Sequence, residues 1–206
     1  TPWRPTFTFD IQPLKRMFPF SWKILFTSVF TQINGNIFSV LLGRFYSSSQ
    51  VGYYTQGSKW MTMGYSFIWN MIAPVSLPVL VETSSDVNRQ RLIFRKMLRF
   101  VSFISFPALL GLAFVAKELI IIGVSDKWLP CVPIMQLLCI WGAVTPISNL
   151  YTHLLLSRGK SDIYLYNTLT LGIVQLVVVI SMLSFGMYYM VLAFVIVNVL
   201  WLFVWH

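Results

Sequence analysis

Six long runs of apolar residues, separated by short polar links, constrain this chain of 206 residues more than any other feature. The hydrocarbon core of a bilayer needs about 20 mostly apolar residues for each spanning helix. The runs reach this length without the alternation of a membrane β-barrel, so helices are favoured. We predict an all-α, polytopic bundle of about six transmembrane helices. They are expected over residues 20–43, 49–81, 98–122, 131–156, 163–183 and 187–206.

The composition excludes an ordinary soluble domain, which has about 45–50% apolar and about 25% charged residues. In this chain 57% of the residues are hydrophobic and 10% are charged. A net charge of +9 would suggest nucleic acid in a soluble protein, but here the basic residues lie between the apolar runs. That position indicates membrane topology instead. We therefore expect membrane lipids, and no nucleic acid, among the partners.

The distribution of Lys and Arg predicts the orientation of the bundle. Six helices divide the polar segments into two sets, which hold eleven and four basic residues. The richer set comprises the N-terminal segment with Lys23, the link over 82–99 and the link over 157–162, and the positive-inside rule places it in the cytoplasm. Residues 1–19 are expected to be an amphipathic cytoplasmic lead-in. Because the chain starts at Thr1 and its last apolar run reaches His206, we expect a piece of a longer protein.

No group of residues in the sequence is arranged for catalysis. The acidic residues all fall in predicted links or at helix ends: Asp10, Glu82, Asp86, Glu118, Asp126 and Asp162. They form no glycosidase-like pair and no Asp-rich magnesium motif, and there is no Gly-rich phosphate loop. We therefore expect no enzyme activity, no metal and no cofactor. Cys131 and Cys139 share one predicted helix, too far apart for a disulfide, and His153 is expected to be structural.

The helix predicted over 20–43 has an unusually wide polar arc. At about 100° per residue, one narrow arc collects the apolar residues Phe26, Val29, Phe30, Ile33, Ile37 and Val40, which we interpret as facing lipid. The remaining arc carries Lys23, Thr27, Ser28, Thr31, Gln32, Asn34, Gly35, Asn36, Ser39 and Gly43. So polar a surface must contact other helices or water. Close helix packing and the wall of a hydrated cavity both remain open, and the width of the arc favours the cavity.

Cationic residues mark two further features. Arg44 ends this first helix, and Lys59 lies about 15 Å inside the next one if Ser48 or Ser49 caps it. A lysine at that depth either extends to the membrane surface or faces water, and in water it would offer a cationic site for an anionic substrate. A basic stretch is interpreted as a solvated cytoplasmic face that contacts anionic lipid head groups: Arg89, Arg91, Arg95, Lys96 and Arg99.

Three groups of short motifs follow one another over about residues 9–185. The first comprises Phe20-Ser21-Trp22-Lys23, Leu42-Gly43-Arg44-Phe45-Tyr46 and Val51-Gly52-Tyr53-Tyr54. The second comprises Pro78-Val79-Leu80, Asp86, the basic run over 89–99, Phe106-Pro107 and Gly111, and the third Asp126-Lys127-Trp128, Pro130, Pro133 and the polar turn over 156–162. In this order and spacing, the chain resembles the C-terminal half of bacterial polysaccharide flippases of the Wzx type. These flippases share a superfamily with lipid II flippases and MATE drug exporters.

The resemblance implies one lobe of a two-lobe transporter in the bacterial inner membrane, with a central cavity that opens alternately to either side. The substrate would be an undecaprenyl-pyrophosphate-linked oligosaccharide, moved outward for surface polysaccharide or lipopolysaccharide synthesis, and the partner would be the N-terminal half of the parent. Because such cavities are often cationic, Lys23, Arg44 and Lys59 become candidates for the pyrophosphate. Neutral candidates for the sugars are Gln32, Asn34, Asn36 and Asn70. Gln56-Gly57 departs from the family pattern of a basic and a small residue, so a charge contact there is in doubt.

Other functional classes fit the sequence less well. A MATE-like exporter of small cations, the main alternative, would want a membrane-embedded carboxylate, which this chain does not show. A polyprenyl glycosyltransferase would need an acidic catalytic motif in a loop. A purely structural membrane subunit would not need the wide polar arc on the first helix.

Overall fold

The computed structural model describes residues 12–205, and most of them are helical. The long helices are α1 (Gln12–Phe45), α2 (Ser48–Glu82), α3 (Val87–Phe114), α5 (Val132–Ser157), α6 (Ser161–Met182) and α7 (Met187–Trp205). A short α4 (Ala116–Gly123) and 3₁₀ turns over Asp126–Cys131 and Leu183–Phe185 connect them. Within the described residues, six stretches are long and apolar enough to cross a membrane. The prediction of an all-α polytopic bundle is confirmed.

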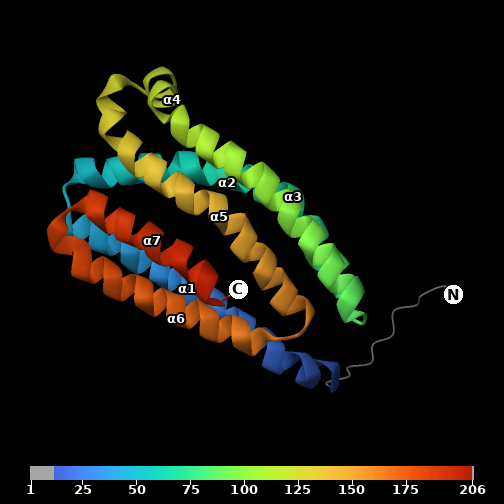
Figure 1. The fold of residues 1–206 in the computed structure, drawn as a ribbon. Helices are drawn as coiled ribbons and strands as arrows, with labels where there is room; N and C mark the ends of the chain where they lie inside the picture. The colour runs from blue at the N-terminus through green and yellow to red at the C-terminus, as the bar shows by residue number, and fades with distance from the viewer. Residues whose placement is uncertain (1–11, 206) are drawn as a thin grey trace, which may run out of the picture.

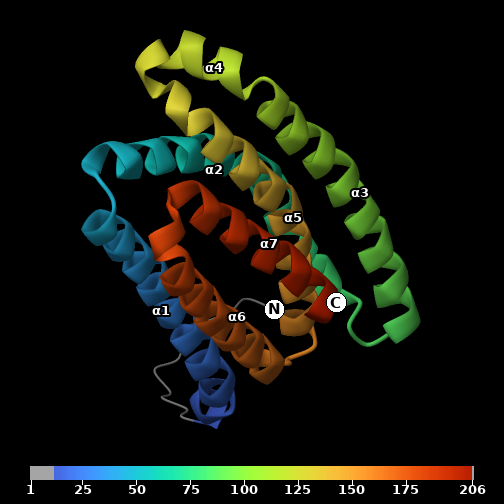
Figure 2. The same cartoon turned by 60° about the vertical axis from the view of Figure 1, so that its left-hand side comes forward.

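The long helices form two groups of three (Figure 1). In one group α5 packs against α2 and α3, and in the other α6 packs against α1 and α7. Contacts between α5 and α7 join the two groups, whereas α1 and α2 touch little. Figure 2 shows α7 between α6 and α5, with α1 on the far side of α6. The space between the two groups therefore has walls from both.

The link between α1 and α2 is held by its own side chains. Ser47 caps α2: its hydroxyl accepts from Gln50 N–H (3.4 Å), and Gln50 Oε1 accepts from Ser47 N–H (3.2 Å). This reciprocal pair satisfies two backbone donors that a helix start leaves free. The Tyr46 hydroxyl donates to the carbonyl of Leu183 (3.1 Å), so the link is also tied to the α6–α7 turn. Burial raises the pKa of this phenol above its ordinary value, so Tyr46 remains a donor.

Two helices start earlier than the apolar runs suggest. The basic stretch is not a link: α3 begins at Val87 rather than at 98, because the Asp86 carboxylate accepts from Asn88 N–H (3.0 Å) and Arg89 N–H (3.1 Å). A turn at Val115 then separates α3 from α4 within the helix predicted over 98–122. Likewise α1 begins at Gln12, so residues 12–19 of the predicted lead-in are its first turns, while 1–11 lie outside the described residues.

The helix α5 is the centre of the core, and small residues let its neighbours approach it. A side-chain carbon at Gly142 would lie 2.9 Å from Met61 Cγ, and one at Gly57 would lie 3.1 Å from the backbone nitrogen of Met135. Ser105 on α3 donates to the carbonyl of Ala143 on α5 (2.7 Å). Small residues and interhelical hydrogen bonds of this kind are how membrane helices associate without a hydrophobic driving force.

Other buried side chains behave as structural residues. His153 Nδ1 lies 2.6 Å from the Ser76 hydroxyl, joining α5 to α2, and its ring packs 5.0 Å from that of Trp69. Cys131 and Cys139 are both buried and free of disulfides. All four side chains therefore contribute to packing around α5.

A buried glutamine joins three helix ends on the side predicted to be cytoplasmic. Gln90, at the start of α3, has no exposed surface. Its Nε2 donates to the Leu80 carbonyl (2.8 Å) and the Ser157 hydroxyl (3.1 Å), and its Oε1 accepts from Arg158 Nε (2.8 Å). The α2–α3 link and the α5–α6 turn are therefore fixed to one another through a fully bonded amide.

Candidate functional site

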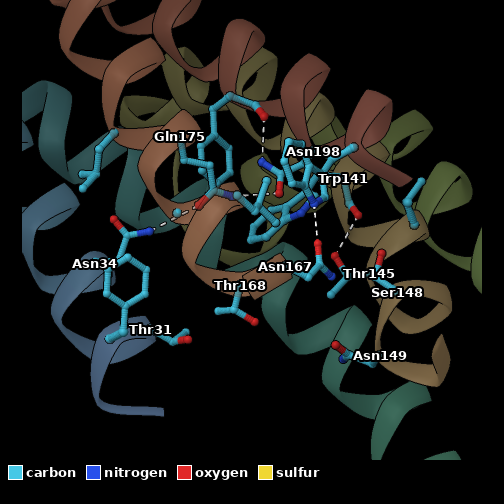
Figure 3. A pocket seen from close by; sticks show the side chains of 18 of the residues that line it. Thr31, Asn34, Trp141, Thr145, Ser148, Asn149, Asn167, Thr168, Gln175 and Asn198 are labelled. Atoms are coloured by element: carbon cyan, nitrogen blue, oxygen red, sulfur yellow. Dashed lines mark hydrogen bonds between the residues drawn. The ribbon is translucent and has the colours of Figure 1, made fainter. Parts of the chain in front are cut away.

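A cavity of about 580 Å³ lies between the two helix groups, with walls from α1, α2, α5, α6 and α7 (Figure 3). This volume is typical of small-molecule sites, which occupy about 300–1,000 Å³. Among the described residues that line it, none carries a charged side chain. The polar lining residues are Thr31, Asn34, Ser39, Tyr54, Ser58, Thr145, Ser148, Asn149, Thr152, Tyr164, Asn167, Thr168, Gln175 and Asn198. We call this space the polar cavity.

Helical spacing explains why these residues converge. Residues three or four apart share one face of a helix. On α5 the cavity face runs through Thr145, Ser148 and Thr152, and on α6 it runs through Thr168 and Gln175. Polar side chains inside a membrane helix turn away from lipid, so each helix directs its polar face into the same interior space.

Three amides form a hydrogen-bonded chain across α1, α6 and α7, which we call the amide relay. Asn34 Nδ2 donates to Gln175 Oε1 (3.3 Å), and Gln175 Nε2 donates to Asn198 Oδ1 (2.9 Å). Asn198 Nδ2 in turn donates to the backbone carbonyl of Phe194 (2.7 Å). The relay therefore ties the second helix group together along one wall of the cavity (Figure 3).

Gly172 lets α1 come close enough for this relay. A side-chain carbon at Gly172 would lie 2.5 Å from Phe30 Cε1 and 3.2 Å from Asn34 Nδ2. Both distances are shorter than an ordinary contact between non-bonded heavy atoms, which is about 3.5–4.0 Å between carbons. The hydrogen bond from Asn34 to Gln175 therefore depends on the absence of a side chain at Gly172.

We expect Gly172→Ala to lower the melting temperature of the full-length protein. The added methyl should force Phe30 and Asn34 away from α6, and such overpacking costs about 1–3 kcal/mol. Gly111→Ala is the matched control, since nothing lies within 4 Å of a side-chain carbon at Gly111. Adding Phe30→Ala to Gly172→Ala should restore part of the loss. Equal melting temperatures for the two single variants would contradict this packing.

Two more amides contribute to the wall. Asn149 Nδ2 on α5 donates to the Tyr65 hydroxyl (3.0 Å). Asn167 Oδ1 on α6 accepts from the indole nitrogen of Trp201 on α7 (2.7 Å). These bonds hold both amides in place, and they leave one half of each amide facing the cavity.

Threonine hydroxyls add oxygen atoms to the lining. Thr31, Thr145, Thr152 and Thr168 each donate to the carbonyl four residues earlier, at 2.8, 2.9, 3.2 and 3.0 Å. Each hydroxyl has one proton, which is used in this bond, but its oxygen keeps lone pairs. These four side chains therefore present hydrogen-bond acceptors to the cavity.

The sequence-predicted site residues separate into different places. Asn34 lines the polar cavity, but Gln32, Asn36, Arg44, Lys59 and Asn70 do not, and all five are exposed. Lys23 pairs with Asp162 at the start of α6 (2.5 Å). That ion pair neutralises its charge and fixes the first turns of α6 to α1. The structure therefore brings Asn34 together with residues of other helices and leaves the three cations outside the cavity.

The polar arc of α1 divides in two. Thr31, Asn34, Gly35 and Ser39 face the cavity, whereas Ser28, Gln32, Asn36 and Gly43 are exposed on the outside of the bundle. On α2, Lys59 and Asn70 are both exposed and share one helix face, because they are three turns apart. We call the exposed residues Ser28, Gln32, Asn36, Gly43, Lys59 and Asn70 the outer polar strip.

The apolar arc predicted on α1 contains one misplaced residue. Phe26, Val29, Ile33, Ile37 and Val40 are exposed, as a lipid-facing surface requires. Phe30 instead lines the polar cavity and lies against Gly172. The space that a glycine leaves on α6 draws the phenyl ring inward, and the sequence of α1 alone carries no sign of it.

The five basic residues of the predicted head-group face are all exposed on the first turns of α3: Arg89, Arg91, Arg95, Lys96 and Arg99. Further along the helix, the exposed residues are Phe103, Phe106 and Phe114. The outer surface of α3 therefore changes from basic to aromatic along its length. Such a change is typical of a helix that passes from the polar interface into hydrocarbon.

The sequence prediction missed the cavity residues on α5, α6 and α7. Gln175 and Asn198 are isolated polar residues within long apolar runs, at positions 163–183 and 187–206. A polar residue in such a run is by default directed to the bundle interior, and this was the available signal. Asn167, Thr168, Asn149 and Thr152 lie nearer the helix ends, where polar residues are common and carry less information.

Comparison with known proteins places the chain. Residues 1–133 match the model of a family described as polysaccharide biosynthesis protein. A Klebsiella pneumoniae protein described as an uncharacterized membrane protein in the cps region is 31% identical, over 85% of this chain and 36% of that protein. No solved structure shows significant similarity.

Two further relatives have names that refer to surface polymers. The teichuronic acid biosynthesis protein TuaB of Bacillus subtilis is 29% identical, over 80% of this chain and 34% of its own length. The lipopolysaccharide biosynthesis protein WzxC of Escherichia coli is 26% identical, over 78% of this chain and 33% of its own length. The chain thus spans about a third of each curated relative. With a family model that covers well over half of its residues, this membrane-spanning chain belongs to the polysaccharide biosynthesis protein family.

Proposed function

We propose that this chain is one helical lobe of a transporter that moves a lipid-linked oligosaccharide outward across the bacterial cytoplasmic membrane. Cell-surface polysaccharide synthesis would use the product. The observation that carries the proposal is a polar, uncharged cavity inside a membrane-spanning bundle of this family. The names of TuaB and WzxC support it, because teichuronic acid and lipopolysaccharide are both assembled from sugars.

The physical need for a cavity comes from the sugar. Moving a hydroxyl group from water into hydrocarbon without a partner costs several kcal/mol, and an oligosaccharide has many hydroxyls. A path lined by amides and hydroxyls replaces water as the hydrogen-bond partner. The polar cavity and the outer polar strip both provide such groups at membrane depth.

The outer polar strip is proposed to border the part of the path shared with the rest of the parent. Lipid cannot solvate its amides or the Lys59 ammonium, so water or another protein surface must cover them. Lys59, together with Arg44 at the end of α1, is the proposed cationic contact for a diphosphate. Lys23 is a weaker candidate, since it already has Asp162 as a partner. Alternating exposure of the path to the two membrane faces completes the proposal.

A transporter is favoured over an enzyme or a cation exporter. The described acidic residues Glu82, Asp86, Glu118, Asp126 and Asp162 lie at helix ends, in links or in the short α4. None of them lines the polar cavity. Neither a catalytic carboxylate nor an embedded carboxylate for a cation is therefore supplied by the described part of this chain.

The basic first turns of α3 are proposed to rest on the anionic inner leaflet. A surface cation near such a leaflet contributes about 1 kcal/mol of attraction. The five side chains together would therefore fix the depth and the orientation of the lobe. This role is independent of substrate, so it serves the transporter without forming part of its path.

Deleting the gene of the full-length protein should abolish the surface polysaccharide that it serves, and the wild-type gene should restore it. In the same strain, Arg44→Ala or Lys59→Ala at normal expression should restore much less, because each removes a proposed partner of the diphosphate. Lys127→Ala, which removes an exposed cation outside both sites, is the control. Full restoration by both Arg44→Ala and Lys59→Ala would refute the cationic contact, and normal polysaccharide in the deletion strain would refute the proposed function.

A further inference from the structure

The direction of every hydrogen bond in the amide relay is fixed by one backbone carbonyl. The Phe194 carbonyl can only accept, so Asn198 must turn its Nδ2 toward it and its Oδ1 toward Gln175. Gln175 must then donate to Asn198 with its Nε2 and present its Oε1 to Asn34. Asn34 must donate with its Nδ2. The Asn34 Oδ1 is therefore left at the end of the relay, and no described group donates to it.

The other two amides are fixed in the same way. The Trp201 indole can only donate, so it occupies Asn167 Oδ1 and leaves the Asn167 Nδ2 without a described acceptor. Asn149 uses its Nδ2 on the Tyr65 hydroxyl, which leaves its Oδ1 without a described donor. The cavity thus offers two neutral amide acceptors and one amide donor pair, in addition to the lone pairs of the four threonine oxygens.

This inventory discriminates among ligands. A diphosphate needs cations and many donors, but no described lining residue is charged and most free polar atoms are acceptors. A lipid chain would leave the amides without partners, at a cost of about 1–3 kcal/mol for each buried group. A sugar hydroxyl both donates and accepts. Trp141 and Trp201 add indole surface to the lining, and such surface packs well against an apolar ligand face.

We propose that the polar cavity is a subsite for the uncharged sugar portion of the substrate, separate from any contact with the diphosphate. This inference rests on the proposed function. Asn34 Oδ1 and Asn149 Oδ1 accept from sugar hydroxyls, and Asn167 Nδ2 donates to a sugar oxygen. The neutral subsite inside the lobe and the cations outside it divide the substrate by chemistry: glycan within, diphosphate at the outer strip.

The test is protection of a cavity cysteine from N-ethylmaleimide. Ser148→Cys is introduced into the full-length protein after its native cysteines are replaced by serine, and Thr152→Cys serves as a second cavity variant. Ser181→Cys is the control, because Ser181 is exposed on α6 and does not line the cavity. Labelling rates are compared in three strains that still export with each variant. One accumulates the complete lipid-linked oligosaccharide, one stops at the carrier with a single sugar, and one makes neither.

We expect the complete oligosaccharide to slow labelling of Ser148→Cys and Thr152→Cys several-fold, with no change for Ser181→Cys. Equal slowing by the single-sugar carrier would show that the carrier, not the glycan, fills the cavity, and would overturn the inference. Unchanged labelling of both cavity variants would also overturn it. In either case the deletion strain decides the proposed function separately, because loss of its polysaccharide would stand whatever occupies the cavity.

Discussion

A full-length protein that carries Gly57→Leu is expected not to accumulate in a folded form. A side-chain carbon at Gly57 would lie 3.1 Å from the backbone nitrogen and 3.3 Å from the Cα of Met135. Backbone atoms cannot rotate away as a side chain can, and α5 is also held by α3 through Ser105. The leucine must therefore separate α2 from α5 along the main contact of the first helix group, at an expected cost of about 3 kcal/mol or more.

Thermal melting and size-exclusion chromatography of a fluorescent fusion would measure this effect. Gly57→Ala should be folded but less stable, since its one added carbon is the atom that makes the short contact. Gly111→Leu is the control, because Gly111 lies on an exposed face of α3 with nothing within 4 Å of its added carbon. If Gly57→Leu and Gly111→Leu behaved alike, the close crossing of α2 and α5 would be wrong.

Gln175→Leu is expected to produce the largest loss of export among changes that leave the bundle folded. Leucine has nearly the same size, but Asn34 Nδ2 and Asn198 Oδ1 would both lose their partner inside the membrane. Interhelical hydrogen bonds in membrane proteins contribute about 0.6–2 kcal/mol each. The two together therefore correspond to a loss of about tenfold or more, at 1.4 kcal/mol per factor of ten.

Surface polysaccharide and melting temperature should be measured on the same variant. Gln136→Leu is the matched control: Gln136 makes one bond, to the Ala113 carbonyl (3.1 Å), and it is exposed on α5 outside the cavity. We expect Gln136→Leu to export normally. Normal export by Gln175→Leu would mean that the amide relay does not support transport.

The fold followed closely from the sequence because apolar length decides membrane helices almost alone. The all-α bundle and the family resemblance are both confirmed. Helix starts were harder, since a cap and not hydropathy begins a helix. Asp86 starts α3 well before the apolar run, and the cluster Thr83-Ser84-Ser85-Asp86 was the signal for it.

The site was only partly predictable. The polar arc of α1 identified Asn34, but a single helix cannot show that the arc serves two surfaces, the cavity for Asn34 and the outer strip for Gln32. Gln175 and Asn198 gain their meaning only when α6 and α7 bring them within hydrogen-bond distance. Charge was a poor guide in this chain, because the Lys23 ammonium pairs with Asp162, which lies far away in the sequence.

The central claim is that this protein moves a lipid-linked glycan from the inner to the outer leaflet, and the leaflet distribution of that glycan tests it most directly. Inverted and right-side-out membrane vesicles from the deletion strain are treated with periodate that does not cross the membrane, and oxidised lipid-linked glycan is measured. We predict oxidation in inverted vesicles only, and in both kinds once the wild-type gene is restored. Equal oxidation in right-side-out vesicles from the deletion strain would contradict the account.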